Sequence, residues 1–288
     1  MLVSRELLAR AESISIPSSR RSRFYQRGER AGLKKGSSLE FSDYREYLQG
    51  DDLRNIDWSV YARSERLFLK MFLEEQSKPV YFVMDSSESM KFGTPSKFTF
   101  ALQLALLLSY SCLRHYDRPH ILLARKDSFQ HIPLRSRKEF FAVLRRLENE
   151  TCGQALEWND MIRRIAFSRL PRGMIFLFSD FYSPAGFDSL KMLAAQGNEL
   201  RCIQILSDEE MQPALRGDFR LLDCESSDRS EVSVTASILR KYHHALLDLQ
   251  NRARTAAQKG GGYFYRISSS ADLGLFVFQT LRAAGVVA

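Results

Sequence analysis

The feature that most constrains the fold is an alternation of short apolar runs and helical segments that begins near residue 79. The apolar runs have the length and bulk of buried strands, and the segments between them place apolar residues on one helical face. Buried strands separated by helices favour a mostly parallel sheet with helices on both faces. We therefore predict a Rossmann-like α/β domain over residues 79–288. The expected strands are 80–84, 121–124, 174–179, 200–206, 219–222, a short one near 232, and 263–267; the expected helices are 97–115, 137–147, 158–169, 185–195, 236–259 and 270–284.

Residues 1–78 do not follow this alternation. Residues 1–36 are predicted to form a basic N-terminal helix, 5–13, and an arm, with nine Lys or Arg against three acidic residues. Residues 37–78 mix aromatic and charged side chains and are predicted to be irregular, to end in a strand near 67–72, and to pack on the α/β domain. A mixed, irregular N-terminal segment thus precedes the sheet.

The formal net charge of +8 arises mostly in the basic arm. Such an arm can contact nucleic acid, an anionic lipid surface or an acidic protein. We expect no specific nucleic-acid partner, because the chain lacks an RNA-binding signature and aromatic residues spaced for base stacking. The alternative is that the arm is only a solvated, partly mobile segment without a partner of its own.

The chain has no run of 18 uncharged apolar residues, and charged residues interrupt its first 15 positions. This pattern predicts neither a transmembrane segment nor a secretory signal, and hence a cytoplasmic protein, with peripheral membrane association left open. The four cysteines form no C-x-x-C pair, so we expect them to be reduced and structural.

Oxygen-bearing side chains follow two of the predicted strands. Asp85, Ser87 and Ser89 come after strand 80–84, and Asp180 comes after strand 174–179. Ligands of open α/β sheets bind outside the carboxyl ends of the strands. If the two strands are neighbours, these side chains suit a hard cation, Mg²⁺ first, with Mn²⁺ or Ca²⁺ as alternatives. The alternative is that they only cap helices and bind loop amides.

These four residues resemble the metal-ion-dependent adhesion site (MIDAS) of von Willebrand factor A domains. There, a D-x-S-x-S loop, a threonine from a second loop and an aspartate from a third surround Mg²⁺. The resemblance implies a von Willebrand A-like fold and an ion that takes a carboxylate from a protein partner as its last ligand. The second loop departs from the pattern. Thr151 is the nearest candidate but lies several residues too early, and Asn159 or Asp160 could serve instead.

The segment at residues 41–63 is dense in arginine, aspartate and aromatic residues. Its alternating charges predict Arg–carboxylate pairs around a half-buried Trp58, which is a structural clasp. Catalytic use of Asp51, Asp52 or Asp57 is the alternative, although no histidine or cysteine nucleophile accompanies them.

The same segment closely resembles the hallmark of the bacterial "domain of unknown function 58" proteins, R-x-Y-x-x-G-D-D-x-R-x-I-D-W-x-x-x-A-R. The resemblance covers roughly residues 28–288. It implies a cytoplasmic partner of MoxR-type AAA+ ATPases in assembly, metal insertion, or stress and envelope pathways, without an enzymatic activity. The matching residues are Arg45, Tyr47, Gly50, Asp51, Asp52, Arg54, Ile56, Asp57, Trp58, Ala62 and Arg63.

Three hypotheses for the function follow. The first is a non-enzymatic protein-binding module that presents Mg²⁺ to a MoxR-type ATPase or its client. The second is a metal-dependent hydrolase of a phosphoester or amide, in which Asp57 or a nearby acid handles the proton. The third is a scaffold that binds through the basic arm, residues 20–35, and keeps only a vestigial metal site.

Overall fold

The computed structural model describes residues 2–17, 39–74, 79–125, 128–153, 158–182, 186–224, 229–259 and 261–288. The chain divides into two compact units. The first, the α/β unit, comprises Met1–Ser18 and Lys78–Ala288, and the second, the signature unit, comprises Ser19–Ser77.

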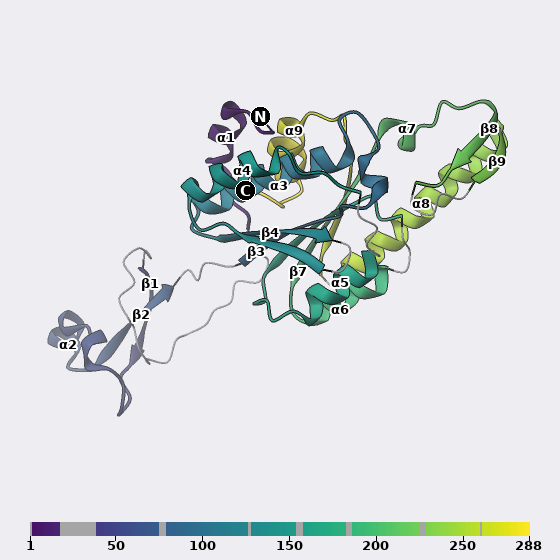
Figure 1. Cartoon of the computed structure of the whole chain (residues 1–288). Helices are drawn as coiled ribbons and strands as arrows, with labels where there is room; N and C mark the ends of the chain where they lie inside the picture. The colour runs from purple at the N-terminus through teal and green to yellow at the C-terminus, as the bar shows by residue number, and fades with distance from the viewer. Residues whose placement is uncertain are drawn as a thin grey trace. The chain divides into compact units, whose positions relative to one another are not determined.

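The α/β unit is built on a six-stranded sheet with the order β10-β7-β6-β3-β4-β5 (Figure 1). All neighbouring strands are parallel except β4 and β5. The first strand along the chain, β3, lies inside the sheet. The next strands, β4 and β5, are added on one side of it, and β6, β7 and β10 are added on the other. This order defines the doubly wound arrangement. The strands are β3 (Pro79–Met84), β4 (Arg118–Arg125), β5 (Ser128–Pro133), β6 (Met174–Ser179), β7 (Glu199–Leu206) and β10 (Tyr263–Ser268).

Helices cover both faces of this sheet (Figure 1). Strand side chains alternate between the faces, so Phe82 belongs to one apolar core and Val83 to the other. On the first face lie α1 (Arg5–Ala11), α3 (Lys97–Arg114), α4 (Arg137–Leu147) and α9 (Leu273–Leu275), which continues as a π-helical segment (Phe276–Leu281). On the second face lie α5 (Trp158–Phe167), α6 (Gly186–Ala195) and α8 (Ala236–Lys259). The predicted von Willebrand A-like, Rossmann-like α/β class is confirmed.

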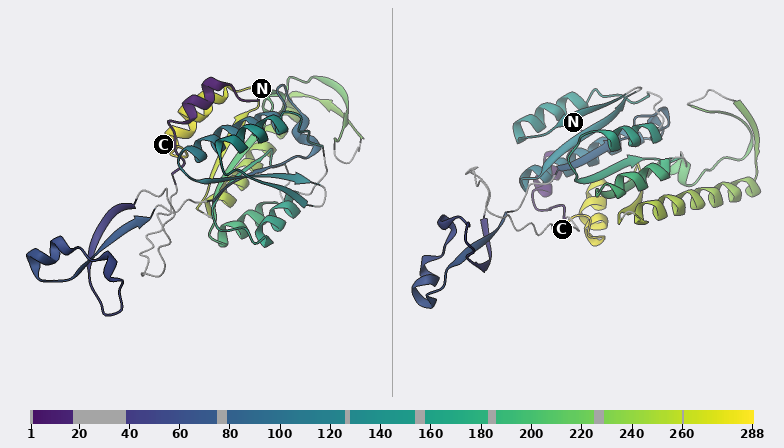
Figure 2. Two further views of the ribbon diagram at one scale, coloured as in Figure 1. Left: turned by 60° about the vertical axis from the view of Figure 1, so that its left-hand side comes forward. Right: turned by 90° about the horizontal axis from the view of Figure 1, so that it is seen from below.

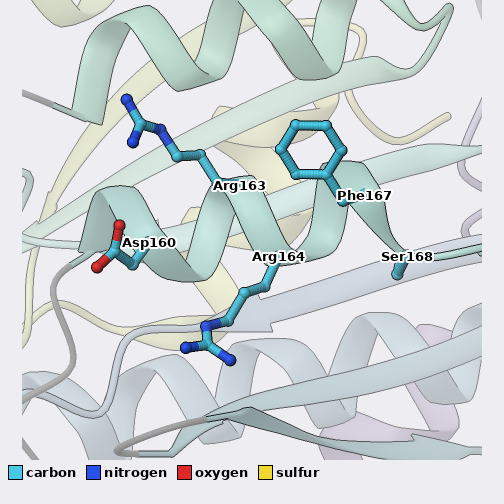
Figure 3. A pocket seen from close by; sticks show the side chains of 5 residues that line it. All are labelled: Asp160, Arg163, Arg164, Phe167 and Ser168. Atoms are coloured by element: carbon cyan, nitrogen blue, oxygen red, sulfur yellow. The ribbon is translucent and has the colours of Figure 1, made fainter.

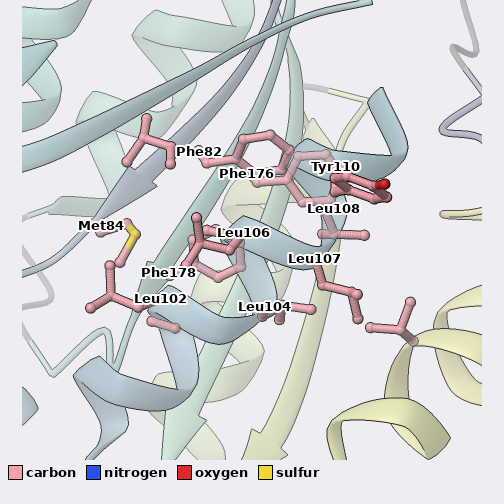
Figure 4. Packing of buried hydrophobic residues seen from close by; sticks show 14 of the residues in the cluster. Phe82, Met84, Leu102, Leu104, Leu106, Leu107, Leu108, Tyr110, Phe176 and Phe178 are labelled. Atoms are coloured by element: carbon pink, nitrogen blue, oxygen red, sulfur yellow. The ribbon is translucent and has the colours of Figure 1, made fainter. Parts of the chain in front are cut away.

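Helix α3 is the central helix of the first face. Its leucines pack against the phenylalanines of β3 and β6, including Phe82 and Phe176, whose stacked rings lie 5.2 Å apart (Figure 4). The helix begins after Ser96, whose side chain accepts a hydrogen bond from the Thr99 amide. This packing fixes the first turn of α3 beside the carboxyl ends of the strands.

The predicted division at residue 36 is wrong for the N-terminal helix. Helix α1 belongs to the α/β unit, because its residues Leu8 and Ala11 are part of the first core of that unit. The backbone of Ser15 exchanges two hydrogen bonds with that of Ala288, which fixes the segment beside the C-terminal residues (Figure 2). The basic arm, residues 20–35, lies outside the described residues.

The signature unit contains an antiparallel pair, β1 (Leu39–Glu46) and β2 (Phe68–Glu74), joined through a 3-10 turn (Leu53–Asn55) and helix α2 (Trp58–Ser64). The strand expected near 67–72 is confirmed, but the expectation of irregular structure before it is wrong. That the unit packs on the α/β domain stays a prediction.

Two further elements follow β7 in the α/β unit. The first is a short helix, α7 (Asp208–Met211), and the second is a hairpin of β8 (Gly217–Leu222) and β9 (Arg229–Val234) beside the N-terminal end of α8 (Figures 1 and 2). Among the described residues, none of the helices has both the length and the apolarity that a membrane crossing requires.

Candidate metal centre

The loop after β3 gathers the oxygen atoms predicted from the D-x-S-x-S motif. Asp85 Oδ1 accepts a hydrogen bond of 2.9 Å from the Ser87 amide, and its Oδ2 accepts one of 2.6 Å from the Ser179 hydroxyl. The hydroxyl oxygens of Ser87 and Ser89 lie 3.0 Å apart. One carboxylate and two hydroxyls are therefore close together at the carboxyl edge of the sheet.

The second predicted carboxylate lies on the neighbouring strand. Strands β3 and β6 pair in parallel, with Met84 opposite Phe178, so both Asp85 and Asp180 come just after paired strand ends. Both side chains are buried. Burial and, second, the negative charge of Asp180 raise the pKa of Asp85 to about 6. The sheet thus brings the two carboxylates together, as predicted.

Lys97, which the sequence analysis did not single out, occupies the same site. Its Nζ donates hydrogen bonds to Asp180 Oδ2 at 2.8 Å and to Glu210 Oε1 at 2.6 Å, and its side chain is 0% exposed. Burial lowers the pKa of Lys97, but the carboxylates of Asp180 and Glu210 outweigh it and leave that pKa above its ordinary value. The two carboxylates therefore favour the charged ammonium form of Lys97.

Glu210 reaches the site from the segment after β7, the strand that neighbours β6 on the side away from β3. It lies in α7, directly after β7, and forms a capping box in which its Oε2 accepts from the Ser207 amide while Ser207 Oγ accepts from the Glu210 amide. The Tyr242 hydroxyl of α8 donates to the Glu210 carbonyl at 2.6 Å. The sequence signal for this carboxylate was the S-x-x-E spacing immediately after a predicted strand.

We refer to Asp85, Asp180, Glu210 and Lys97 together as the edge cluster. Three carboxylates and one ammonium carry a net charge of −2 when all are ionised, and the ammonium is shared between two of the carboxylates, Asp180 and Glu210. Repulsion between Asp85 and Asp180 already raises the pKa of Asp85. Among the described residues, no three His, Cys, Asp or Glu side chains are placed to hold one metal ion together. The oxygen donors that fit a divalent ion are therefore the Asp85 carboxylate and the Ser87 and Ser89 hydroxyls, and a cation beside Asp85 would relieve the repulsion from Asp180.

The second loop approaches the motif through its backbone. The Gly153 amide donates to the Ser86 carbonyl at 2.8 Å, so residues 151–153 run beside the Asp85 loop. Thr151 itself is exposed. The residues that follow, 154–157, lie outside the described residues. Which residue of this loop replaces the adhesion-site threonine stays a prediction.

The two alternatives for the second loop have other surroundings. The Asn159 side-chain carbonyl accepts a hydrogen bond from the Ser189 hydroxyl of α6. Asp160 lines an open hollow of about 480 Å³ with Arg163, Arg164, Phe167 and Ser168 (Figure 3). These lining residues belong to α5 and the residue after it, so this hollow is distinct from the edge cluster.

The charged residues of the signature unit form local pairs. Arg45 contacts Asp51 at 2.7 Å, and Arg54 contacts Asp52 at 3.2 Å, so two of the predicted Arg–carboxylate pairs are present. Gly50 adopts a left-handed φ of 103° in the turn before them, a conformation that favours glycine. In the same unit, the Tyr47 amide donates to the Leu67 carbonyl and Arg63 Nε donates to the Ser59 carbonyl.

Asp57 is a buried carboxylate of the signature unit. It is the N-cap of α2, where its Oδ1 accepts from the Ser59 and Val60 amides, and its Oδ2 accepts from the Tyr44 hydroxyl at 2.9 Å. The prediction that Trp58 is half-buried is wrong, because the indole is 60% exposed and contacts Tyr61 edge to face. Trp58 begins α2, a helix without buried residues, so no core receives its ring.

The fold and its carboxyl-edge loops define a von Willebrand A-like α/β protein. The model of the family described as "Protein of unknown function DUF58" matches residues 43–253, and the chain belongs to this family. The chain is 28% identical over 218 residues to "Uncharacterized protein Rv1480" of Mycobacterium tuberculosis, which covers 73% of this chain and 68% of the relative. The same values hold for "Uncharacterized protein Mb1516" of Mycobacterium bovis.

Three solved structures are similar at low sequence identity. BatB from Bacteroides thetaiotaomicron has a TM-score of 0.41 at 14% identity and covers 73% of this chain and 97% of its own. An aerotolerance-related membrane protein from Bacteroides fragilis has a TM-score of 0.45 at 14% identity, covering 73% and 98%. The SpRpn10 VWA domain has a TM-score of 0.40 at 10% identity, covering 70% and 94%.

Proposed function

We propose that the protein is a non-enzymatic binding module that holds a divalent cation at the edge cluster and presents it to an acidic group of a protein partner. The observation that carries the proposal is the Asp85 carboxylate, buried beside a second carboxylate and next to two hydroxyls. Burying a carboxylate is costly unless a cation or a set of hydrogen bonds compensates it. Asp85 has hydrogen bonds from the Ser87 amide and the Ser179 hydroxyl, and a bound divalent ion would add to that compensation.

The ligand roles follow from the contacts. Asp85 would supply the direct carboxylate, and Ser87 and Ser89 would supply hydroxyl oxygens. Ser179 would act indirectly, because its hydroxyl holds Asp85 Oδ2 at 2.6 Å and thereby fixes the orientation of the carboxylate. Mg²⁺ is the expected ion, with Mn²⁺ and Ca²⁺ as alternatives, because all of these donors are oxygens. Its remaining positions would take water or a partner's carboxylate.

We further propose that the partner is a MoxR-type AAA+ ATPase or its client. The support for this partner is membership of the family together with the expectation that the signature segment implies. A cytoplasmic location is part of the same proposal. The hydrolase alternative gains nothing from Asp57, because that carboxylate caps α2 and accepts from Tyr44.

The test is a pull-down of a MoxR-type ATPase from the same organism by the full chain, with Mg²⁺ or with EDTA. Asp85→Asn keeps the shape of the side chain but removes the charged ligand, so we expect at least about tenfold weaker capture, equal to the loss in EDTA. Asp188→Asn, at an exposed position in α6, is the matched control and should bind like the wild type. Capture that is unchanged in EDTA would overturn the metal-dependent mechanism.

A further inference from the structure

Lys97 occupies a position that is unfavourable for a lysine. It is the first residue of α3, directly after the N-cap Ser96, and the positive end of the helix dipole disfavours a cation there. Its side chain is also fully buried. Neither helix stability nor solubility accounts for a lysine at this place, so its contacts with Asp180 and Glu210 must do so.

Those contacts determine what Asp180 can offer to a metal ion. Asp180 Oδ2 accepts from the Lys97 ammonium at 2.8 Å, and Oδ1 accepts from the Tyr182 amide at 3.3 Å. A divalent cation that bound Asp180 directly would approach the ammonium closely. Repulsion between like charges at such a distance is strong in a buried site. Asp85, by contrast, accepts from neutral donors, Ser179 and Ser87.

We propose that Lys97 is a built-in competitor of the divalent cation, and that by neutralising Asp180 it leaves Asp85 as the single direct carboxylate of the native site. The inference rests on the proposed metal-binding function and explains why the ion would need an outside ligand. With one protein carboxylate, the ion keeps residual positive charge, and a partner's carboxylate completes its coordination. With two, the protein alone would satisfy it. Lys97 therefore sets the dependence on an acidic partner.

The experiment measures Mg²⁺ binding to the full chain by calorimetric titration with the metal alone. Lys97→Met keeps most of the length of the side chain and releases both Asp180 and Glu210 from the ammonium, so we expect at least about tenfold tighter Mg²⁺ binding than in the wild type. Adding Asp180→Asn to that variant should remove most of this gain, since the freed carboxylate beside Asp85 is lost while the freed Glu210 remains. Lys191→Met, which removes an exposed lysine of α6, is the matched charge control and should change the affinity less than about twofold.

The outcomes separate this inference from the proposed function. Tighter binding by Lys97→Met supports the role of Lys97 as a competitor even if the wild type binds no Mg²⁺. That second result would overturn the metal part of the proposed function and, with it, Asp85 as a direct ligand in the native protein. Equal or weaker binding by Lys97→Met overturns the inference, as does a variant that binds no Mg²⁺ at all.

A second variant keeps the inference testable if Lys97→Met does not fold. Asp180→Asn preserves the shape and can still accept a hydrogen bond from Lys97. Because Lys97 already neutralises Asp180, we expect this variant to bind Mg²⁺ within about threefold of the wild type. A loss of about tenfold or more would identify Asp180 as a direct ligand and overturn the inference.

Discussion

The two units of the chain place paired charges in opposite environments. In the α/β unit, the Lys97 ammonium contacts two carboxylates and is fully shielded from solvent. In the signature unit, the Arg54 side chain contacts Asp52 and is 90% exposed. Solvent screens the second pair and allows its members to separate at little cost. The contacts of Lys97 cannot be broken without leaving charges buried. Contacts of similar length therefore differ greatly in what they contribute to stability.

The largest effect is expected from breaking the buried contact. Lys97→Met leaves Asp180 and Glu210 without their cation, and losing one partner of a buried pair destabilises a protein by about 3–5 kcal/mol. Urea unfolding of the full chain in EDTA measures the change in the free energy of unfolding. Lys191→Met should lie within about 0.5 kcal/mol of the wild type. A change below about 1 kcal/mol for Lys97→Met would show that water reaches the cluster.

In the signature unit, the largest effect is expected at its buried carboxylate. Asp57→Ala removes the cap of α2 and the acceptor for Tyr44, and together these contribute about 2 kcal/mol. The backbone amides of α2 should then exchange with deuterium about 30-fold faster. Tyr44→Phe removes only the hydroxyl contact and should give about a fivefold increase. Equal exchange in Asp57→Ala and the wild type would contradict the capping role.

Asp85→Asn is expected to stabilise the fold at neutral pH without metal, by no more than about 3 kcal/mol. The folded-state pKa of Asp85, about 6, exceeds its ordinary value of 3.8. The folded chain therefore binds the proton more tightly, and its stability falls as the pH rises from about 4 to about 6. Asparagine cannot ionise and escapes this loss.

Thermal unfolding in EDTA checks this effect. The melting temperature of Asp85→Asn should exceed that of the wild type at about pH 7, and the difference should vanish below about pH 4. Asp188→Asn is again the control, because its carboxylate is exposed. If the wild type is more stable than Asp85→Asn at neutral pH without metal, the ionised Asp85 carboxylate stabilises the folded chain. That result would contradict the expectation that it is held at a cost for a ligand.

The strands of the α/β unit were predictable because each buried run has a length and composition that few other structures accommodate. Strand β5 was missed: it is short, lies at the edge of the sheet, and buries only Ile132 among its residues. The proximity of Asp85 and Asp180 could be predicted because each residue follows the carboxyl end of a predicted buried strand. The role of Lys97 did not, because a lysine that opens an amphipathic helix is normally exposed, and its partners lie 83 and 113 residues away in sequence.

The signature unit was less predictable for a related reason. Its aromatic residues suggested a buried cluster, but Trp58 lies on a helix of seven residues that buries none of them. Whether an indole is buried depends on packing against other elements. A helix of seven residues is too short for the spacing of its apolar residues to predict which face is buried. Its charge pairs were predictable because their members are close in sequence.

The smallest effect is expected from breaking an exposed pair. Arg54→Ala removes the guanidinium that contacts Asp52, but the backbone amide of residue 54 still donates to Asp52 Oδ1, so the capping hydrogen bond at the 3-10 turn remains. We therefore expect no resolvable change in melting temperature or in amide exchange of the turn. Asp52→Ala, which removes that acceptor, is the informative counterpart and should speed exchange at the Arg54 amide. If Arg54→Ala instead destabilises the unit as much as Asp57→Ala does, the exposed Arg54–Asp52 pair contributes more stability than a solvent-screened pair should. That result would contradict the proposed difference between buried and exposed charge pairs in the two units.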